Sequence, residues 1–269
     1  MSQPPRRQSL QQPAHLPPQP PAPMRESRRP HRSRRGIGDW IITIVGELLV
    51  TAGIFIGLFL LWQMWYTNIE AAENNRVAAE QLETQFVDPV QKKVEPAQRH
   101  TDLPPPVKSR GLNEPYAKLY IPSWGTDYMV AIAEGLSYTQ VLNHGLVGHY
   151  PDTNAIGELG NAGLAAHRMT RGAVFQDIET LNPGDEVIVE SEDSWIVFTV
   201  ESTEIVNPNQ GEVLLPVPHK SGEEPQRALL TLTTCHPLMS TRERYIVYTE
   251  FSYWIDRADG MPDALLEDN

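Results

Sequence analysis

The sequence predicts a mainly β domain, a closed barrel or a sandwich, carried behind one membrane-spanning helix. Six short runs rich in β-branched and aromatic residues lie between residues 118 and 251 and are separated by turn sequences such as Asn182-Pro183-Gly184-Asp185. Many short strands with few helices are typical of barrels and sandwiches. An apolar stretch, Ile41–Tyr66, is long enough at 1.5 Å per residue to cross a hydrocarbon core of about 30 Å.

Residues 1–39 predict a disordered, cytoplasmic tail. Residues 1–36 are rich in Pro, Gln, Ser and Arg and hold almost no large apolar side chains, so burial cannot offset the entropy lost on ordering. Neither aromatic residues nor a folded nucleic-acid-binding motif accompany the arginines. The basic tail most simply fixes the topology and contacts anionic lipid of the inner leaflet.

The predicted membrane span covers residues 40–66. Trp40 at one end and Trp62, Trp65 and Tyr66 at the other suit the two membrane interfaces. The span is too long for a signal-peptide core, so we expect it to be retained as an anchor. Glu47 lies within it, where a charge is expensive in lipid.

Charge predicts the orientation of this single-pass anchor. Residues 1–40 carry eight arginines against two carboxylates, a net of +6, and the first basic residue after the span is Arg76. The positive-inside rule therefore places the N-terminus in the cytoplasm and the rest outside the cell membrane. Since the whole chain carries −12, the remainder carries −18, which argues against nucleic acid as a partner.

Residues 67–110 read as an extracellular stalk, and residues 111–269 have the size of one domain. The stalk begins with polar, helix-forming sequence and turns Pro- and charge-rich after residue 87, which predicts a semi-rigid spacer. The domain shows two short helical signals, Leu136–Gly145 and Ala173–Leu181. Its predicted strands are Lys118–Trp124, Asp185–Ser191, Ser194–Ser202, Glu212–Val217, Arg227–Cys235 and Glu243–Phe251.

Cys235, the only cysteine, ends the run TLTTC, and a disulfide within the chain is excluded. A free cysteine can be a small packing residue. It can also be a nucleophile, which requires a histidine to handle the proton and a cation or N–H donors for the oxyanion. His167, in GLAAHRMT, and Arg244, in TRERYIVY, could supply these roles.

Other residues compete for these roles. His236 adjoins Cys235, but neighbours on a strand point to opposite faces, so it is poorly placed as the base. Arg242 shares a face with Arg244 if the strand is already regular there. Tyr120 and Tyr128 would line a substrate groove or pack in the core. No His/Cys/Asp/Glu cluster has zinc spacing, so we expect neither a metal nor a cofactor.

Several motifs together resemble one known family. TLTTC, HRMTRGAVFQDIETLNPGDEV, YIPSWG, GHYPDT and the final Arg244 are similar to class E sortases, which are membrane-anchored cysteine transpeptidases of high-GC Gram-positive bacteria. The resemblance covers about residues 115–260. It implies a closed β-barrel of about eight strands, with a few short helices, in which the cysteine, histidine and arginine meet in one groove.

The resemblance also implies roles and partners. Cys235 would form a thioacyl intermediate with a sorting signal of LPxTG or LAxTG type, cleaved between Thr and Gly, with the Ala form favoured. His167 would transfer protons, Arg244 would bind the oxyanion, and Thr234 would belong to the groove wall. The donors would be secreted proteins, and the acceptor an amine on a peptidoglycan precursor. Two alternatives stay open: a pilin polymerase using a lysine amine, and a non-catalytic anchored module that binds peptides.

Overall fold

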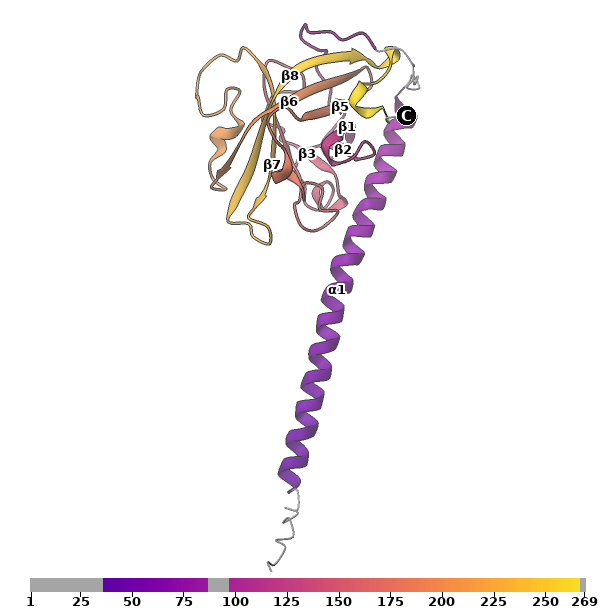
Figure 1. The fold of residues 1–269 in the computed structure, drawn as a ribbon, viewed down its shortest axis with the longest axis vertical. Helices are drawn as coiled ribbons and strands as arrows, with labels where there is room; N and C mark the ends of the chain where they lie inside the picture. Colours follow the sequence, from indigo (N-terminus) through magenta and orange to yellow (C-terminus); the bar gives the residue numbers. More distant parts are fainter. Residues whose placement is uncertain (1–35, 87–96, 267–269) are drawn as a thin grey trace, which may run out of the picture. The chain divides into compact units, whose positions relative to one another are not determined.

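The structure, a computed structural model, describes residues 36–86 and 97–266 (Figure 1). Contacts divide the chain into two units, Met1–Gly53 and Ile54–Asn269. The predicted disordered tail falls almost wholly on residues 1–35, which lie outside the described residues. Residues 87–96 of the predicted stalk also lie outside them.

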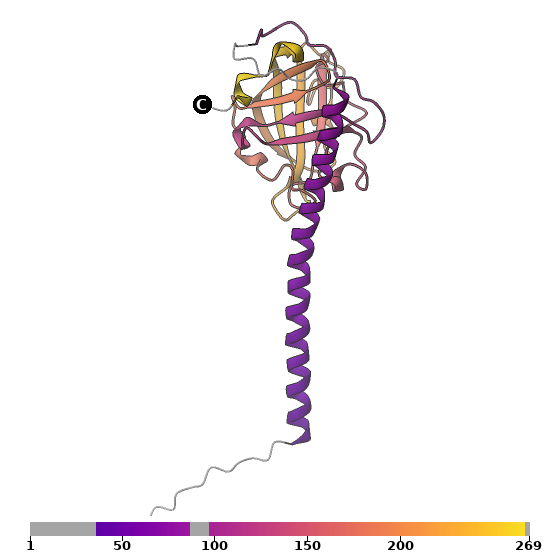
Figure 2. The ribbon, with the colours of Figure 1, turned by 90° about the vertical axis from the view of Figure 1, so that its right-hand side faces the viewer.

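Eight strands close into a barrel, which confirms the predicted fold (Figures 1 and 2). Their order around the barrel is β1-β2-β3-β4-β7-β8-β6-β5, and β5 pairs with β1 to close it. The pairs β2–β3 and β4–β7 are parallel, whereas the other pairs are antiparallel. The strands are β1 Pro115–Tyr120, β2 Met129–Glu134, β3 Val147–His149, β4 Gly160–Ala165, β5 Glu186–Glu190, β6 Ser194–Val206, β7 Ala228–His236 and β8 Glu243–Asp256.

Alternation along the strands separates the barrel interior from its outer face. Leu230 and Leu232 of β7 and Val247 of β8 belong to the main hydrophobic core. Successive side chains of a strand point to opposite faces, so Thr233 and Cys235 lie on the outer face of β7. Because Cys235 is on that face, the core leaves its thiol accessible from outside the barrel.

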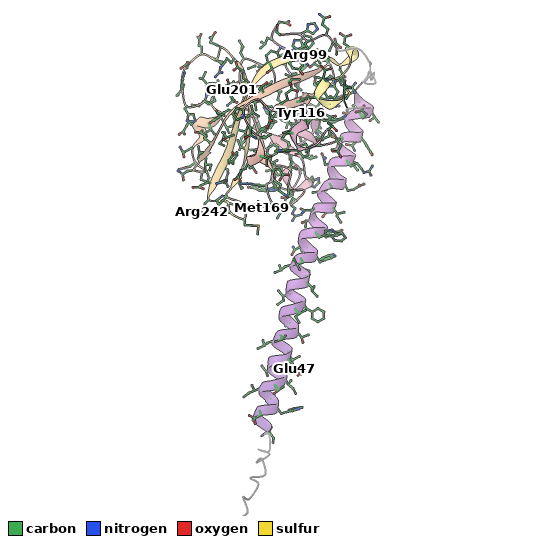
Figure 3. The ribbon with its side chains drawn as sticks, viewed as in Figure 1. Glu47, Arg99, Tyr116, Met169, Glu201 and Arg242 are labelled. Carbon is green, nitrogen blue, oxygen red and sulfur yellow. The ribbon has the colours of Figure 1, made fainter. Side chains whose placement is uncertain are left out.

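The helix α1 runs without a break from Ile37 to Gln85. Among the described residues it is the one helix long and apolar enough to cross a membrane, and the large apolar side chains of its N-terminal, apolar part are exposed. Glu47 lies in the apolar part (Figure 3). No Gly or Pro occurs between Gly57 and Gln85, so nothing in the sequence breaks the helix where its composition turns polar.

The polar part of α1 packs directly on the barrel. Ala78 and Leu82, together with Phe86 just after the helix, form a buried apolar cluster with β2 and with the segment that follows it. Asn75 fixes the register: its Nδ2 donates to the Met129 carbonyl (3.1 Å), and its Oδ1 accepts from the Ala131 N–H (2.8 Å). The segment interpreted as a stalk is therefore, up to Phe86, part of the surface of the folded domain.

A buried cluster of charges ties the end of α1 to the barrel. Glu190, on β5, accepts from Arg257 Nε (2.9 Å) and lies 3.3 Å from Lys118 Nζ on β1. Glu83 of α1 pairs with both cations, and Tyr120 donates its hydroxyl proton to Glu190 (2.7 Å). Buried charges are tolerated when they are paired and hydrogen-bonded, which is the case here.

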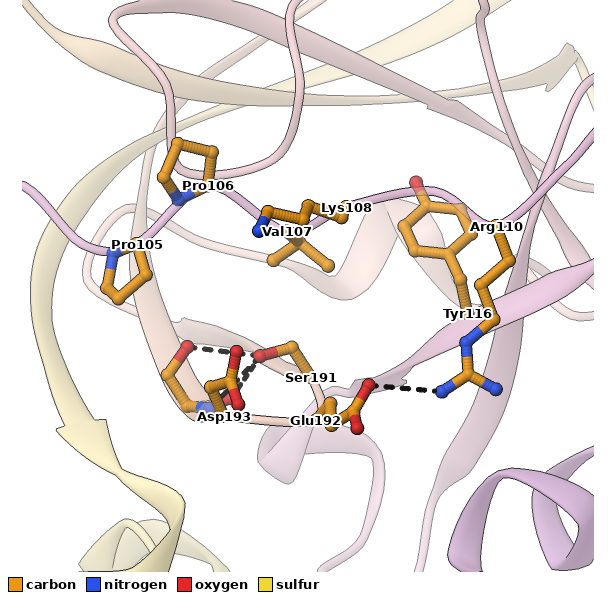
Figure 4. Close-up of a pocket in the computed structure, with 10 residues that line it drawn as sticks. Pro105, Pro106, Val107, Lys108, Arg110, Tyr116, Ser191, Glu192 and Asp193 are labelled. Atoms are coloured by element: carbon orange, nitrogen blue, oxygen red, sulfur yellow. Dashed lines mark hydrogen bonds and ion pairs between the residues drawn. The ribbon is translucent and has the colours of Figure 1, made fainter. Parts of the chain in front are cut away.

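Residues 100–110 run along the barrel as an irregular strap. His100 exchanges two backbone hydrogen bonds with Trp254 (2.8 and 2.9 Å), and the Val107 N–H donates to the Ile156 carbonyl (2.9 Å). A cavity of about 240 Å³ lies between the strap and the β5–β6 turn, where Arg110 donates to Glu192 (3.2 Å; Figure 4). Neither the cysteine nor a histidine lines this cavity, so it is not the candidate active site.

Several local predictions were wrong. The predicted strand Glu212–Val217 is a short 3-10 helix, Gly211–Leu214, because the nearby Pro216 and Pro218 cannot donate to a ladder. The two helical signals shrink to the 3-10 turns Leu142–His144 and Ile178–Thr180. The strands β2, β3 and β4 were missed, and β4 (GNAGLA) has none of the β-branched residues that mark a strand.

Candidate active site

The end of β7 presents Cys235 beside β8. In the antiparallel register Cys235 lies directly opposite Arg244. Directly opposite residues point to the same face, with Cβ atoms about 4.5–5.5 Å apart. The thiol and the guanidinium therefore share the outer face of the barrel, and Cys235 is half-buried.

The parallel neighbour β4 brings His167 to the same end. Gly163 pairs with Thr231 and Ala165 with Thr233, so the chain leaves β4 beside the last residues of β7. The Thr234 hydroxyl donates to the Ala166 carbonyl (2.7 Å). This bond fixes the backbone immediately before His167.

A groove of about 160 Å³ joins the three groups. Cys235, His167 and Arg244 all line it, as does Thr234. The other lining residues are Leu136, Tyr138, Leu142, Tyr150, Ala165, Ala166 and Thr233. The groove thus offers a nucleophile, an imidazole and a cation within a wall of apolar, aromatic and hydroxyl side chains.

His167 is held by contacts on two sides. Its Nε2 lies 2.9 Å from Asn143 Oδ1, and its ring lies 5.9 Å from the ring of Tyr138, centroid to centroid. Burial lowers the pKa of His167 below its ordinary value, and the positive charge of Arg171 lowers it further. The ring is therefore more often neutral at neutral pH than a free histidine.

Backbone carbonyls at the start of β8 hold the Arg244 side chain in place. Its Nη1 donates to the carbonyl oxygens of Thr241 (3.0 Å) and Glu243 (2.9 Å). Thr241 belongs to the β7–β8 turn and Glu243 is the first residue of β8, so the start of β8 and the turn before it hold this nitrogen of the guanidinium. The held guanidinium lines the groove on the side of β8.

The two predicted substrate tyrosines lie away from the groove. Tyr120 packs with Trp195 and donates to Glu190 in the buried charge cluster. Tyr128 donates its hydroxyl proton to the Val174 carbonyl (2.6 Å) and packs against the core. In the described part of the chain the groove aromatics are instead Tyr138 and Tyr150.

The competing residues take other places. His236 pairs with Glu179 (2.7 Å) and does not line the groove. Arg168 pairs with the same carboxylate (2.8 Å). Arg242 is exposed at the end of the barrel labelled in Figure 3 and is not a lining residue.

The sequence predicts a short helix over Leu136–Gly145 but does not single out Asn143 within it. The only available signal was Gly145, whose left-handed φ of 72° closes a turn two residues after Asn143. That turn places the amide beside a histidine 24 residues away, which no local pattern reveals. Within the described ranges, no group of three or more His, Cys, Asp or Glu could hold a metal.

A closed barrel with a thiol, an imidazole and a guanidinium in one outer groove is the architecture of a cysteine transpeptidase. The sortase domain profile matches residues 119–252. Sortase SrtE1 of Streptomyces coelicolor is 34% identical over 255 residues, which cover 90% of this chain and 66% of SrtE1. Sortase SrtE2 of the same organism is 33% identical, over 84% of this chain and 86% of SrtE2.

Structural similarity agrees with these matches. The SrtA sortase from Actinomyces oris shares 38% identity with a TM-score of 0.60, over 64% of this chain and 98% of that structure. The chain belongs to the sortase family. Within that family it is class E-like, as its similarity to SrtE1 and SrtE2 shows.

Proposed function

We propose that the protein cleaves a sorting signal of LAxTG or LPxTG type between Thr and Gly and transfers the acyl group to an amine of a cell-wall precursor. The observation that carries this proposal is the pairing of Cys235 with Arg244 across β7 and β8, in a groove that His167 also lines. Family membership supports the reaction class, and the class E resemblance favours the Ala form of the signal.

In the first half of the reaction the Cys235 thiolate attacks the carbonyl carbon of the Thr. The C–N bond to Gly breaks, His167 gives its proton to the leaving amine, and a thioester remains on Cys235. Arg244 would stabilise the negative oxygen of the tetrahedral intermediate. Two carbonyls occupy its Nη1, and the residue lines the groove.

In the second half an incoming amine attacks the thioester. His167 takes the amine proton, a new amide bond forms, and the thiolate leaves. His167 thus alternates between the charged and the neutral ring. Its lowered pKa favours the neutral form that accepts a proton from the amine.

The groove favours a wall-anchoring client over the pilin alternative. No described residue of 67–110 lines the groove, so no lid from that segment appears in the described ranges. A lid would be expected for a polymerase that protects its intermediate while it waits for a lysine amine. We therefore assign secreted, signal-bearing proteins as donors and a peptidoglycan-precursor amine as the acceptor.

We also propose that α1 anchors the enzyme in the cell membrane, with residues 1–39 in the cytoplasm and the barrel outside. The length and apolar composition of α1 are consistent with an anchor. The orientation rests on the eight arginines that precede the span.

The test uses the full chain in detergent micelles with LAxTG and LPxTG peptides and a simple amine, read by mass spectrometry. We expect cleavage after Thr and an amine-ligated product, both abolished in Cys235→Ala. Intact peptides of both types, with a Cys235 that resists alkylation, would instead favour the non-catalytic peptide-binding module. The full chain is preferable to a truncation at Pro106, which would remove the packed part of α1.

A further inference from the structure

Asn143 holds the imidazole of His167 through a hydrogen bond to Nε2. Its Oδ1 accepts from Nε2–H at 2.9 Å, and an amide oxygen can only accept. The bond is compatible with both the neutral and the charged ring, provided that Nε2 keeps its proton. It therefore assigns the exchangeable proton to Nδ1, the nitrogen that Asn143 leaves free.

The turn that carries Asn143 is rigid. The Asn143 N–H donates to the Tyr138 carbonyl (2.9 Å), and the His144 N–H donates to the Val141 carbonyl (3.0 Å). Gly145 closes the turn in the left-handed region, where a side chain is unfavourable. This turn therefore sets the position of the Asn143 side-chain amide.

The helix α1 packs against the back of the turn. Ala71 is fully buried, and a Cβ built on Gly145 would lie 2.8 Å from the Ala71 carbonyl oxygen. Ala71 also faces Gly172: a Cβ built there would lie 3.2 Å from the Ala71 Cβ. Asn68 Oδ1 accepts from the Gly172 N–H (3.1 Å). Two small turns, one on each side of His167 in the sequence, thus rest on one face of α1.

This face is held in place over its whole length. Asn75 bonds to β2, and Leu82 and Phe86 pack with Val141 and Leu146 on both sides of the turn. The charge cluster at Glu83 fixes the far end. A shift of α1 therefore displaces the turn that bears Asn143.

We propose that Asn143 is a positioning residue for His167, and that residues 68–85 of α1, with Phe86 just after them, hold Asn143 in place. The role of His167 rests on the proposed function, whereas the bond and the packing do not. Without the amide the ring can rotate and change tautomer, so the fraction of enzyme with a proton on the correct nitrogen falls. The helix that leaves the membrane thereby becomes part of the support of the active site.

The first test replaces Asn143 in the full chain in detergent micelles. Asn143→Ala is expected to lower kcat about 10–100-fold with little change in KM, by analogy with the loss of outer-shell partners elsewhere. Asn143→Asp keeps the acceptor and adds a negative charge, so activity should largely return and the pH-rate limb of His167 should move to higher pH. An Asn143→Ala enzyme with wild-type kcat and pH profile would overturn the proposal.

The second test uses two adjacent alanines of α1. Ala71 is buried against the turns, whereas Ala72 is exposed. Ala71→Leu should lower kcat at least about 10-fold, Ala72→Leu should leave it unchanged, and Ala71→Leu should add little in an Asn143→Ala background. Equal activity of the two leucine variants would refute the role of the helix. If Ala71→Leu unfolds, Asn68→Ala, which removes only the bond to Gly172, replaces it with the same expected direction.

A third readout separates this proposal from the proposed function. ¹⁵N NMR of the His167 ring reports its tautomer without any substrate. We expect a single Nε2–H tautomer in the wild type and in Cys235→Ala, and a mixture in Asn143→Ala. The same tautomer mixture in all three proteins would overturn the positioning role. A single tautomer in the absence of any peptide turnover would overturn only the assigned reaction.

Discussion

At the residue scale, the groove depends on side chains whose partners are backbone atoms. Arg244 is fixed by the carbonyls of Thr241 and Glu243, and Thr234 by the carbonyl that precedes His167. His167 instead has a side-chain partner, Asn143. Such a site keeps its geometry as long as the barrel end and its turns keep theirs, so conservative changes at these residues test chemistry more than folding.

Arg244→Lys is expected to retain charge and lose function. The compact ammonium cannot reproduce the planar fork that is held by two carbonyls while it faces the groove. We expect kcat for transpeptidation to fall about 10²-fold, within the range found for loss of an oxyanion donor. Arg242→Lys, at an exposed position that does not line the groove, is the matched control. Near wild-type turnover in Arg244→Lys would contradict the assigned role.

Arg171→Gln is expected to raise the pKa of His167. Arg171 contributes to the lowered value, although burial remains the larger cause, so the pKa should rise and still stay below that of a free histidine. An NMR titration of the His167 ring measures this directly. An unchanged or lower pKa in Arg171→Gln would show that this charge does not act on the ring.

The lowered pKa also sets the sign of a stability effect. Because the unfolded chain binds this proton more readily than the folded one, His167 lowers the stability of the protein as pH falls below about 6.5, and the effect vanishes above that pH.

At the element scale, the docked part of α1 is as much a part of the domain as any strand. Its buried side chains contact β2 and the turn that follows β2. Helix formation alone would not hold it there, since the stability of most protein helices comes from packing of one face. The apolar contacts and the charge cluster together keep the segment on the barrel.

Leu82→Ala should therefore destabilise the whole domain. Leu82 is 1% exposed, and truncating such a side chain leaves a cavity that typically costs about 2–5 kcal/mol. Val77→Ala, at a position 39% exposed on the same helix, should change stability by less than about 0.5 kcal/mol. Denaturant unfolding followed by fluorescence compares the free energies of unfolding of the two variants. An equally small loss of stability in both variants would show that the packing of α1 does not stabilise the domain.

The strands that the sequence predicted carry many β-branched and aromatic residues. They include the long strands β6 and β8 and the end of β7 that holds Cys235, whereas the missed strand β4 consists mostly of small residues. β4 is built from Gly, Asn, Ala and Leu, because small residues let other chain segments approach closely: a Cβ on Gly163 would lie 2.9 Å from the Tyr150 ring. Close packing of this kind is a tertiary property that local propensity does not record.

The residues of the candidate site were likewise predicted only in part. The spacing of motifs was enough to select Cys235, His167 and Arg244, which line one groove. It placed Tyr120 and Tyr128 there as well, although a buried carboxylate and a backbone carbonyl hold them elsewhere. Asn143 was invisible because its relevance arises only when a turn is pressed against a helix.

At the scale of the whole molecule, an apolar helix and an acidic domain form one continuous chain. Eight arginines precede the predicted span and the first basic residue after it is Arg76, a bias that favours one orientation across a membrane. Because α1 is unbroken from Ile37 to Gln85, the same helix includes the predicted span and the surface that packs on the barrel.

A reporter enzyme fused after Asn269 tests the orientation. We expect activity outside the cell, and cytoplasmic activity for the same reporter fused before Met1, since the arginines precede the span. Cytoplasmic activity of the C-terminal fusion would overturn the topology.

Tyr66 and Asn68 are separated by only one residue of the unbroken helix α1. Asn68 already bonds to the loop that follows His167, and it lies only about 3 Å along the helix axis from the last aromatic residue of the span. With residues 40–66 as the proposed membrane span, no flexible spacer would separate the end of the span from the first residue that contacts the barrel domain. For the proposed reaction, a client held in the same membrane would have to bring its signal close to the bilayer, so the length of the spacer between the signal and the client's own anchor would affect which clients are processed.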